Sequence, residues 1–359
     1  MKIAIVHDWL VTDAGAEKVL RAILEIYPDA DIFSTVDFLD TKDRKNIIDD
    51  KKVTTSFIQK LPFAKKHFRN YLFLFPKAIE SFDLSSYDLI ISSSWAFAKG
   101  VRTHTNQIHI CYCYTPIRYV WDLYDEYTEN IKQPKKFIVQ KTLAYIRNWD
   151  FETTNRVDYF IAISEFVKER IQRTYDRKST VIYPPVDTSS YTLCEKKEDF
   201  YLTASRLVSY KKTKLIVEAF NTMPDKKLIV IGDGDEYDAI AKIAQPNITL
   251  LGYVEKKEMI EYMKKAKAFL YAAIEDFGIV PIEAMSCGTP VISFNKGGTK
   301  ETVPQHCGVH FETQTVDSIV AAVTRFETKN FSAKEISKYA ERFDTKHFQK
   351  EIQEYINKL

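Results

Sequence analysis

Two glutamates eight positions apart, Glu275 and Glu283, are the residues whose types and spacing could do chemistry. Carboxylates accept hydrogen bonds well, for instance from the vicinal hydroxyls of a sugar. Gly278 lies between them and lets the backbone come close to a ligand, while amides at a helix N-terminus suit a phosphate. The alternative is that Glu283 caps or solubilises a helix and that Glu275 is a loop charge. Spacing alone favours this alternative, because short motifs have many false positives.

The elements that position these glutamates can be predicted from their neighbours. The apolar run 268–273 predicts a buried strand. Pro281 is placed as the first residue of a helix, and Gly288 as its C-terminal stop. In a parallel α/β sheet, such a strand–loop–helix unit places the loop at the carboxyl end of a strand, where ligands bind. We therefore expect Glu275 on the loop and Glu283 one turn into the helix.

The stretch from Glu275 to Thr289 resembles the Glu-x7-Glu signature of retaining glycosyltransferases with the GT-B fold, glycosyltransferase family 4, which includes bacterial mannosyltransferases. The resemblance implies that Glu275 contacts the donor sugar and that Glu283 holds the ribose. It also implies that three backbone positions approach the sugar and phosphate, namely those of Phe277, Gly278 and Ile279.

A second charged loop carries Arg206 and Lys211, five positions apart after an apolar run at 200–205. Both cations could reach a diphosphate, Arg as a fork and Lys as a point charge; alternatively they are surface charges. The loop resembles the family's Arg-Leu-Val-x-x-Lys segment, which implies that these two residues are diphosphate ligands, with Lys212 as a substitute if the register differs. In such a transferase they do the work that a metal does elsewhere, so we expect no metal and no cofactor.

Glycine-containing turns add further candidates for donor binding. Gly232 follows the apolar run 228–231, but the full Gly-x-Gly-x-x-Gly of dinucleotide binders is missing. In the family this turn flanks the nucleotide, and the base lies near a Gly-x-Val such as the one ending at Val254. A β-loop-α opening near the N-terminus contains Gly15 and Ala16, where the family commonly has two glycines beneath the donor phosphates.

The passage from Tyr114 to Asp122 resembles the family's His-Thr-Pro segment, with Tyr114 in place of the His. In the family that His helps to stabilise positive charge in the transition state. A tyrosine can donate a hydrogen bond but supplies no cation near neutral pH. Either the enzyme works without that cation, or the donor differs, a 6-deoxy sugar for example, or activity is lost. Arg118 and Asp122 either line the acceptor side, where we also place His7, or pair with each other.

Composition limits the remaining possibilities. With 359 residues the chain is long enough for two domains, and 45% apolar with 28% charged residues is typical of a globular protein. A net charge of +2 argues against a strongly electrostatic nucleic-acid binder. Five cysteines without metal-ligand spacing indicate reduced thiols. No stretch approaches the ~20 apolar residues of a membrane span, and the N-terminal apolar run is too short for a signal peptide. These features predict a cytoplasmic protein.

Basic and aromatic residues alternate over residues 57–77. This pattern suits a membrane interface, where rings insert and basic side chains meet lipid phosphates. A core-packed helix with a solvated basic face is an equal alternative. A peripheral position at the inner face of the cell membrane therefore stays open.

The fold class that these features predict is α/β with two Rossmann-like domains, which in the GT-B fold face each other across a cleft. We expect an N-terminal acceptor-side domain at 1–183, a hinge at Pro184 and Pro185, and a donor-side domain at 188–343. The helix 344–359 is a candidate for packing back on the first domain. Expected strands lie at 3–6, 30–35, 87–92, 108–114, 158–164, 180–187, 200–205, 228–231, 248–254, 268–273 and 291–294.

The predicted reaction is transfer of a hexose from a nucleoside diphosphate sugar to a hydroxyl of a glycan or lipid-linked glycan, with retention at the anomeric carbon. GDP-mannose is the donor that the resemblance favours, and UDP-hexoses stay open. A non-catalytic nucleotide-sugar-binding or scaffold protein would account for Tyr114 and Ala16. A nucleotide-sugar epimerase or hydrolase is the other rival, and it would need no acceptor.

Overall fold

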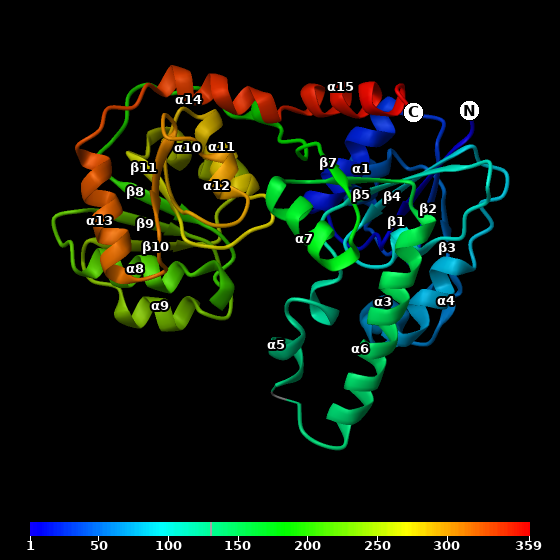
Figure 1. Cartoon of the computed structure of the whole chain (residues 1–359). Coiled ribbons are helices and arrows are strands. Elements are labelled where there is room, and N and C mark those ends of the chain that lie inside the picture. Colours follow the sequence, from blue (N-terminus) through cyan, green and yellow to red (C-terminus); the bar gives the residue numbers. More distant parts are fainter. Residues whose placement is uncertain (130) are drawn as a thin grey trace. The chain divides into compact units, whose positions relative to one another are not determined.

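The computed structural model describes residues 1–129 and 131–359, which form two compact units. The first unit comprises Met1–Tyr183 and Glu351–Leu359, and the second comprises Pro184–Lys350. Helix α15 (Thr345–Ile356) passes from the second unit into the first. There Tyr355 contacts Tyr159, with ring centroids 6.4 Å apart. Figure 1 shows both units coloured along the chain.

The first unit is built on a parallel sheet in the order β3-β2-β1-β4-β5-β6-β7. Its strands are β1 (Ile3–His7), β2 (Asp31–Ser34), β3 (Val53–Thr55), β4 (Leu89–Ser94), β5 (Ile108–Cys113), β6 (Tyr159–Ala162) and β7 (Ser179–Val181). Its helices are α1 (Gly15–Ile26), α2 (Thr41–Ile48), α3 (Ala64–His67), α4 (Phe75–Glu80), α5 (Tyr124–Thr128), α6 (Lys135–Glu152) and α7 (Glu165–Tyr175). Continuous apolar runs such as 3–6 form the central strands because both faces of a parallel sheet are covered.

The second unit has a parallel sheet in the order β10-β9-β8-β11-β12-β13. Its strands are β8 (Tyr201–Ala204), β9 (Leu228–Ile231), β10 (Ile248–Gly252), β11 (Ala268–Tyr271), β12 (Val291–Phe294) and β13 (Gly308–Phe311). Its helices are α8 (Thr213–Asn221), α9 (Tyr237–Ile243), α10 (Lys256–Lys265), α11 (Ile279–Ser286), α12 (Thr299–Thr302), α13 (Val316–Glu327) and α14 (Ala333–Ala340). Helices α8, α9 and α13 cover one face of this sheet, and α10, α11 and α14 cover the other (Figure 1).

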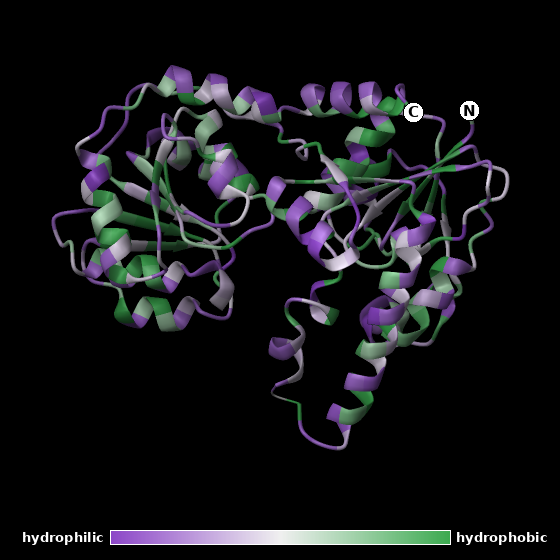
Figure 2. Cartoon of the chain, in the orientation of Figure 1, coloured by the Kyte–Doolittle hydropathy of each residue, from purple (hydrophilic) through white to green (hydrophobic). Residues whose placement is uncertain are grey.

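Each unit has its own apolar core. Buried side chains from strands and covering helices form one cluster around Val6, Phe75 and Phe97 and another around Leu207, Phe220 and Leu270. Figure 2 shows hydrophobic strands inside and hydrophilic stretches on the outer helices. Among the described residues, no helix is long and apolar enough to cross a bilayer.

Several local predictions need correction. Strands β3 and β13 were not expected, and the strand predicted at 180–187 ends at Val181. The strand predicted at 87–92 extends further, since Ser93 and Ser94 also belong to β4 and are buried.

The basic and aromatic stretch 57–77 is broken into short turns of helix, not a single helix. Phe68 and Phe75 are buried in the core, whereas Phe63 is 82% and Phe73 is 53% exposed. Arg69 lies 4.6 Å above the ring of Phe68. Some aromatic residues of this stretch therefore pack inside and others face solvent, and contact with a membrane stays a prediction.

Candidate active site

The second sheet has a topological switch point beside β8. From β8 the chain adds β9 and β10 on one side and then returns to add β11 on the other side. The loops that follow β8 and β11 therefore lie next to each other at the carboxyl edge of the sheet. In open α/β sheets, ligands bind at this kind of position.

Lys211 and Glu275 meet at this switch point. The Lys211 ammonium lies in direct contact with the Glu275 carboxylate, although the two residues are 64 positions apart. The same ammonium lies 3.3 Å from the hydroxyl of Tyr271, the last residue of β11. The two charged side chains are 16% and 25% exposed, so a ligand can reach them. Burial, followed by the charge of Glu275, raises the pKa of the Tyr271 phenol.

Arg206 lies on the same loop as Lys211. Its side chain is exposed, and among the described contacts its guanidinium forms no ion pair. The loop thus presents one cation that is neutralised by Glu275 and one that is open to solvent. An anion entering here would meet a fork of N–H donors and an ammonium with further protons to donate.

Glu283 lies in α11 as predicted, and it is 7% exposed. The buried ring of Tyr191 lies beside it: burial raises the pKa of the Tyr191 phenol, and the charge of Glu283 raises it further. The helix begins at Ile279, so Pro281 is its third residue and not its first. Proline is tolerated there because the N–H groups of the first turn have no partner within the helix.

The loop before α11 is shaped by Gly278, whose φ of +89° lies in the left-handed region. This conformation lets the helix start immediately afterwards, with its first amides free of a side-chain cap. Phe277 is buried and packs against Phe343 at a centroid distance of 5.7 Å. The amide of Gly298 donates to the carbonyl of Glu275 at 2.8 Å and so holds the loop against its neighbour.

The glycine turn after β9 packs directly on the loop that carries Arg206. A Cβ on Gly232 would lie 1.8 Å from the carbonyl oxygen of Ser205, so only glycine fits. The amide of Gly232 donates to the carbonyl of Gly252 at 2.8 Å, which brings the turn before Val254 to the same edge of the sheet. The structure therefore gathers the predicted donor-binding positions of the second unit at one sheet edge.

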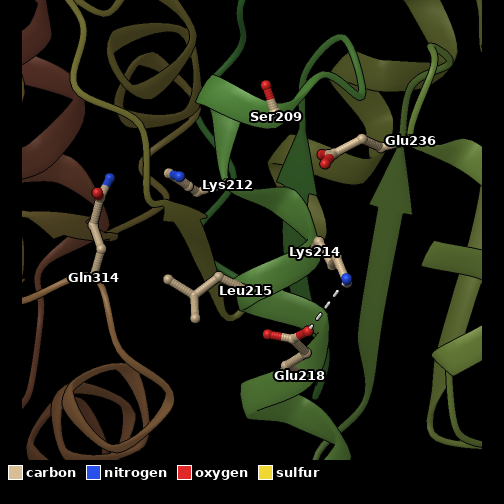
Figure 3. Close-up of a pocket in the computed structure, with 7 residues that line it drawn as sticks. All are labelled: Ser209, Lys212, Lys214, Leu215, Glu218, Glu236 and Gln314. Carbon is tan, nitrogen blue, oxygen red and sulfur yellow. Dashed lines mark ion pairs between the residues drawn. The ribbon is translucent and has the colours of Figure 1, made fainter. Parts of the chain in front are cut away.

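Lys212 has different surroundings from Lys211. Its φ of 59° is left-handed, and its side chain lines a hollow of about 320 Å³ (Figure 3). The hollow is lined by Ser209, Lys212, Lys214, Leu215, Glu218, Glu236 and Gln314. Lys214 and Glu218 form an ion pair there at 3.9 Å. Of the two neighbouring lysines, Lys211 is the one that meets Glu275.

The first sheet has its own switch point, between β1 and β4. Asp8 follows β1 and is fully buried. Its carboxylate accepts four backbone N–H groups from the segment after β4, those of Trp95, Ala96, Phe97 and Ala98, at 2.6 to 2.8 Å. Burial raises the pKa of Asp8, and the amide hydrogen bonds act in the opposite direction. This carboxylate fixes the loop and has no capacity left for a ligand.

Tyr114 lies near Asp8 and the loop that it fixes. Its hydroxyl donates to the carbonyl of Ala16 at 3.1 Å and lies 2.9 Å from the hydroxyl of Ser93. Ser93 in turn lies 2.9 Å from Nδ1 of His7. Burial raises the pKa of Tyr114, so the phenol is neutral. Gly15 and Ala16 are the first residues of α1 and not part of a loop before it.

Arg118 and Asp122 form an ion pair, with Nε and Oδ2 3.6 Å apart. Arg170 from α7 also reaches Asp122, at 3.4 Å. The pairing that the sequence left open therefore exists. A role of the two residues on the acceptor side stays a prediction.

Sequence reasoning did not single out Asp8, Ser93, Glu17, Tyr191 or Tyr271. Asp8 and Ser93 lie at the carboxyl ends of neighbouring strands, where a polar residue after an apolar run is a usable signal. Tyr271 gives no such signal, because an aromatic residue in an apolar run is most often part of a core. Tyr191 stands alone in a polar stretch and gives none either.

The whole chain shares its fold with GT-B glycosyltransferases. The Anabaena protein Alr3699/HepE in complex with UDP superposes with a TM-score of 0.71 at 20% identity over the full length of both chains. The lipopolysaccharide outer core galactosyltransferase WaaB in its apo form gives a TM-score of 0.70 at 18% identity, again over both full lengths. The predicted fold class, two Rossmann-like α/β domains of the GT-B type, is confirmed.

Two family models match the sequence: "Glycosyltransferase Family 4" over residues 15–190 and "Glycosyl transferases group 1" over residues 191–343. Together they account for the chain from residue 15 to residue 343, and the protein belongs to glycosyltransferase family 4.

Several curated relatives are named as mannosyltransferases, at modest identity. The GDP-mannose-dependent monoacylated alpha-(1-6)-phosphatidylinositol monomannoside mannosyltransferase of Corynebacterium glutamicum is 28% identical over 194 residues, 45% of this chain and 51% of that protein. The alpha-1,3/1,6-mannosyltransferase ALG2 of Saccharomyces cerevisiae is 25% identical over 226 residues, 48% of this chain and 45% of that protein. The chain spans about half the length of the curated relatives it matches.

Proposed function

We propose that the protein is a retaining glycosyltransferase that moves a hexose from a nucleoside diphosphate sugar to a hydroxyl of a glycan or lipid-linked glycan. The observation that carries the proposal is the meeting of Lys211 and Glu275 at the switch point of the second sheet, on a loop that also presents Arg206. Family membership and the names of the curated relatives support it.

In this proposal the cations of the second unit stabilise the leaving diphosphate. Arg206 and Lys211 bind its oxygens, and Glu275, released from Lys211, orients the sugar. Glu283 accepts hydrogen bonds from the ribose hydroxyls. The backbone of Phe277, Gly278 and Ile279 and the turns at Gly232 and Val254 surround the donor. Because two side-chain cations can balance the charge of the diphosphate, the proposal calls for no metal and no cofactor.

GDP-mannose is the proposed donor. Support comes from the relatives, which are named as mannosyltransferases in Corynebacterium, yeast and Salmonella, the last an O-antigen chain mannosyltransferase. Alr3699/HepE was crystallised with UDP and with UDP-glucose, so a UDP-hexose is the alternative donor. The corresponding process is assembly of a surface polysaccharide.

We place the protein in the cytoplasm with peripheral contact at a membrane. Phe63 and Phe73 are exposed in the stretch 57–77, which also carries Lys60, Lys65, Lys66 and Lys77. Exposed rings among lysines suit the interface of an anionic bilayer. Replacing both rings by Ser should reduce sedimentation with anionic vesicles several-fold and leave nucleotide binding unchanged; unchanged sedimentation would contradict the membrane contact.

A catalytically impaired nucleotide-sugar-binding protein is the second candidate. The observation that favours it is the engagement of the Tyr114 hydroxyl, whose proton goes to the carbonyl of Ala16. A protein of this kind would bind the nucleotide and transfer nothing.

The test is a transfer assay with GDP-mannose and UDP-glucose and a set of lipid-linked and soluble saccharide acceptors, with and without EDTA. Transfer from GDP-mannose, unaffected by EDTA and with an α-linked product by NMR, is the expected result. Sugar release without transfer would support a hydrolase. Nucleotide binding without any turnover would support the second candidate.

A further inference from the structure

A buried chain of polar groups connects four elements of the first unit. His7 ends β1, Ser93 lies in β4, Tyr114 follows β5, and Glu17 lies in the first turn of α1. His7 and Ser93 are fully buried and Glu17 is 3% exposed. The contacts run from His7 Nδ1 to Ser93 Oγ at 2.9 Å, from there to Tyr114 Oη at 2.9 Å, and on to the carbonyl oxygen of Ala16 at 3.1 Å.

The carbonyl at the end of this chain fixes the direction of every hydrogen bond in it. A carbonyl oxygen only accepts, so the single phenolic proton of Tyr114 goes to Ala16. The Tyr114 oxygen must then accept from Ser93, and the Ser93 oxygen must accept from Nδ1–H of His7. His7 is therefore protonated at Nδ1.

The other ring nitrogen of His7 faces a carboxylate. Nε2 lies 3.6 Å from Oε1 of Glu17 and has no hydrogen-bond partner among the described residues. The second oxygen of Glu17 accepts the amide of Ala14 at 3.1 Å. An unprotonated Nε2 would direct its lone pair at a carboxylate oxygen, so this contact requires a proton. Glu17 already acts as an acceptor toward the Ala14 amide, so we assign the proton to Nε2 of His7.

We propose that His7 is a buried imidazolium held by Glu17, and that through Ser93 it orients the Tyr114 hydroxyl as a positioning group for the proposed transfer. The catalytic part of this inference rests on the proposed function, and the charge state does not. Neutral His7 would leave a buried conflict, either Nε2 against Glu17 or the Tyr114 oxygen against the Ala16 carbonyl. Buried polar groups of this kind are costly unless they are satisfied.

The groups around His7 favour the charged form. Glu17 faces it from α1, and the Asp8 carboxylate follows it directly along the chain. The Trp95 ring lies 5.0 Å away in an edge arrangement. Tyr114 is the remaining titratable group in the chain of contacts, and it is neutral. A positive His7 would balance the charge of these two neighbouring carboxylates.

The decisive experiment is ¹⁵N NMR of histidine-labelled full-length protein, with the His7 signals assigned by their loss in His7→Asn. The wild type should show a proton on both ring nitrogens of His7 near neutral pH. In Glu17→Gln the new carboxamide can donate to Nε2, so His7 should carry a proton on Nδ1 alone. Glu25→Gln, at an exposed glutamate of the same helix, is the matched control and should match the wild type. A single protonated nitrogen in the wild type would overturn the proposal.

Kinetics test the positioning role. Ser93→Ala separates His7 from Tyr114 and should lower kcat about 10-fold or more with the donor KM within about twofold, because a misplaced group slows the chemical step. An unchanged kcat in Ser93→Ala would contradict the role. If the wild type binds no nucleotide, the proposed function fails, and the NMR result still decides the charge of His7.

Discussion

The two sheets have the same kind of switch point, but the polar groups at the two positions are used differently. In the first sheet, Asp8 accepts four amides, and His7, Ser93 and Tyr114 are hydrogen-bonded among themselves. In the second sheet, Lys211 and Glu275 form an ion pair with each other and remain partly exposed. In the first arrangement, few hydrogen-bonding groups remain for a ligand. In the second, a ligand can bind the charged groups in place of their present partner.

This difference separates stability from function. Hydrogen bonds to a buried charged group contribute about 1.5–3 kcal/mol each when they are removed. A partly exposed ion pair contributes about 0–1 kcal/mol. We therefore infer that Asp8 stabilises the first unit and that the Lys211–Glu275 pair serves binding.

The largest effect should follow Asp8→Asn. The carboxamide places an NH₂ group against backbone N–H donors that now meet a carboxylate, so the first unit should lose about 3 kcal/mol of stability or more. All four tryptophans, Trp9, Trp95, Trp121 and Trp149, belong to this unit, so tryptophan fluorescence during urea unfolding reports on it. Asp13→Asn, at an exposed aspartate, is the control. Equal unfolding midpoints for both variants would contradict the anchoring role.

Lys211→Ala should lower activity and leave stability nearly unchanged. Loss of the ammonium should reduce kcat by about 100-fold, as removal of one charge-stabilising donor does in other enzymes. Its unfolding midpoint should stay close to that of the wild type, since the ion pair is partly exposed. Lys212→Ala is the matched control and should keep most of the activity. A larger loss in Lys212→Ala than in Lys211→Ala would show that the site is misassigned.

A smaller effect concerns the stability of the protein at acidic pH. Burial lowers the pKa of His109 to about 4, and its ring is hydrogen-bonded to Ser92 and the carbonyl of Arg156. The unfolded chain takes up this proton near pH ~6.5, the ordinary value. Between these values the unfolded state binds more protons, so stability falls as pH drops. From pH ~7 to ~5 the loss should be about 2 kcal/mol.

His109→Asn isolates this contribution, because all other titrating groups are common to both proteins. Urea unfolding followed by tryptophan fluorescence at the two pH values measures the difference. The variant should show a smaller pH dependence than the wild type. The same slope in both would mean that His109 is already charged in the folded protein.

Much of the architecture could be predicted from local sequence. Continuous apolar runs such as 3–6 and 268–273 predict buried parallel strands, and charged or glycine-containing loops after them mark the sheet edge. Short strands such as β3, with three half-buried or exposed residues, carry too little pattern to detect. The broken helices of 57–77 follow from kinks that residue periodicity does not show.

Contacts between residues that are far apart in the sequence are the part of the site that could not be predicted. Glu275 and Glu283 could be placed on their loop and helix from neighbours in sequence. The partner of Glu275 could not, because Lys211 lies on another loop and reaches it only through the strand order. The same holds for His7 and Ser93, which are 86 positions apart.

The most direct test of the central claim, that the second switch point binds a nucleoside diphosphate, is calorimetric titration of GDP, UDP and ADP. The proteins are the wild type, Glu283→Ala and, as a control at an exposed glutamate, Glu258→Ala. Tight binding of one nucleotide, GDP by our proposal, should weaken by at least ~10-fold in Glu283→Ala, or ~1.4 kcal/mol, and stay unchanged in Glu258→Ala. No binding of any nucleotide to the wild type would contradict the account.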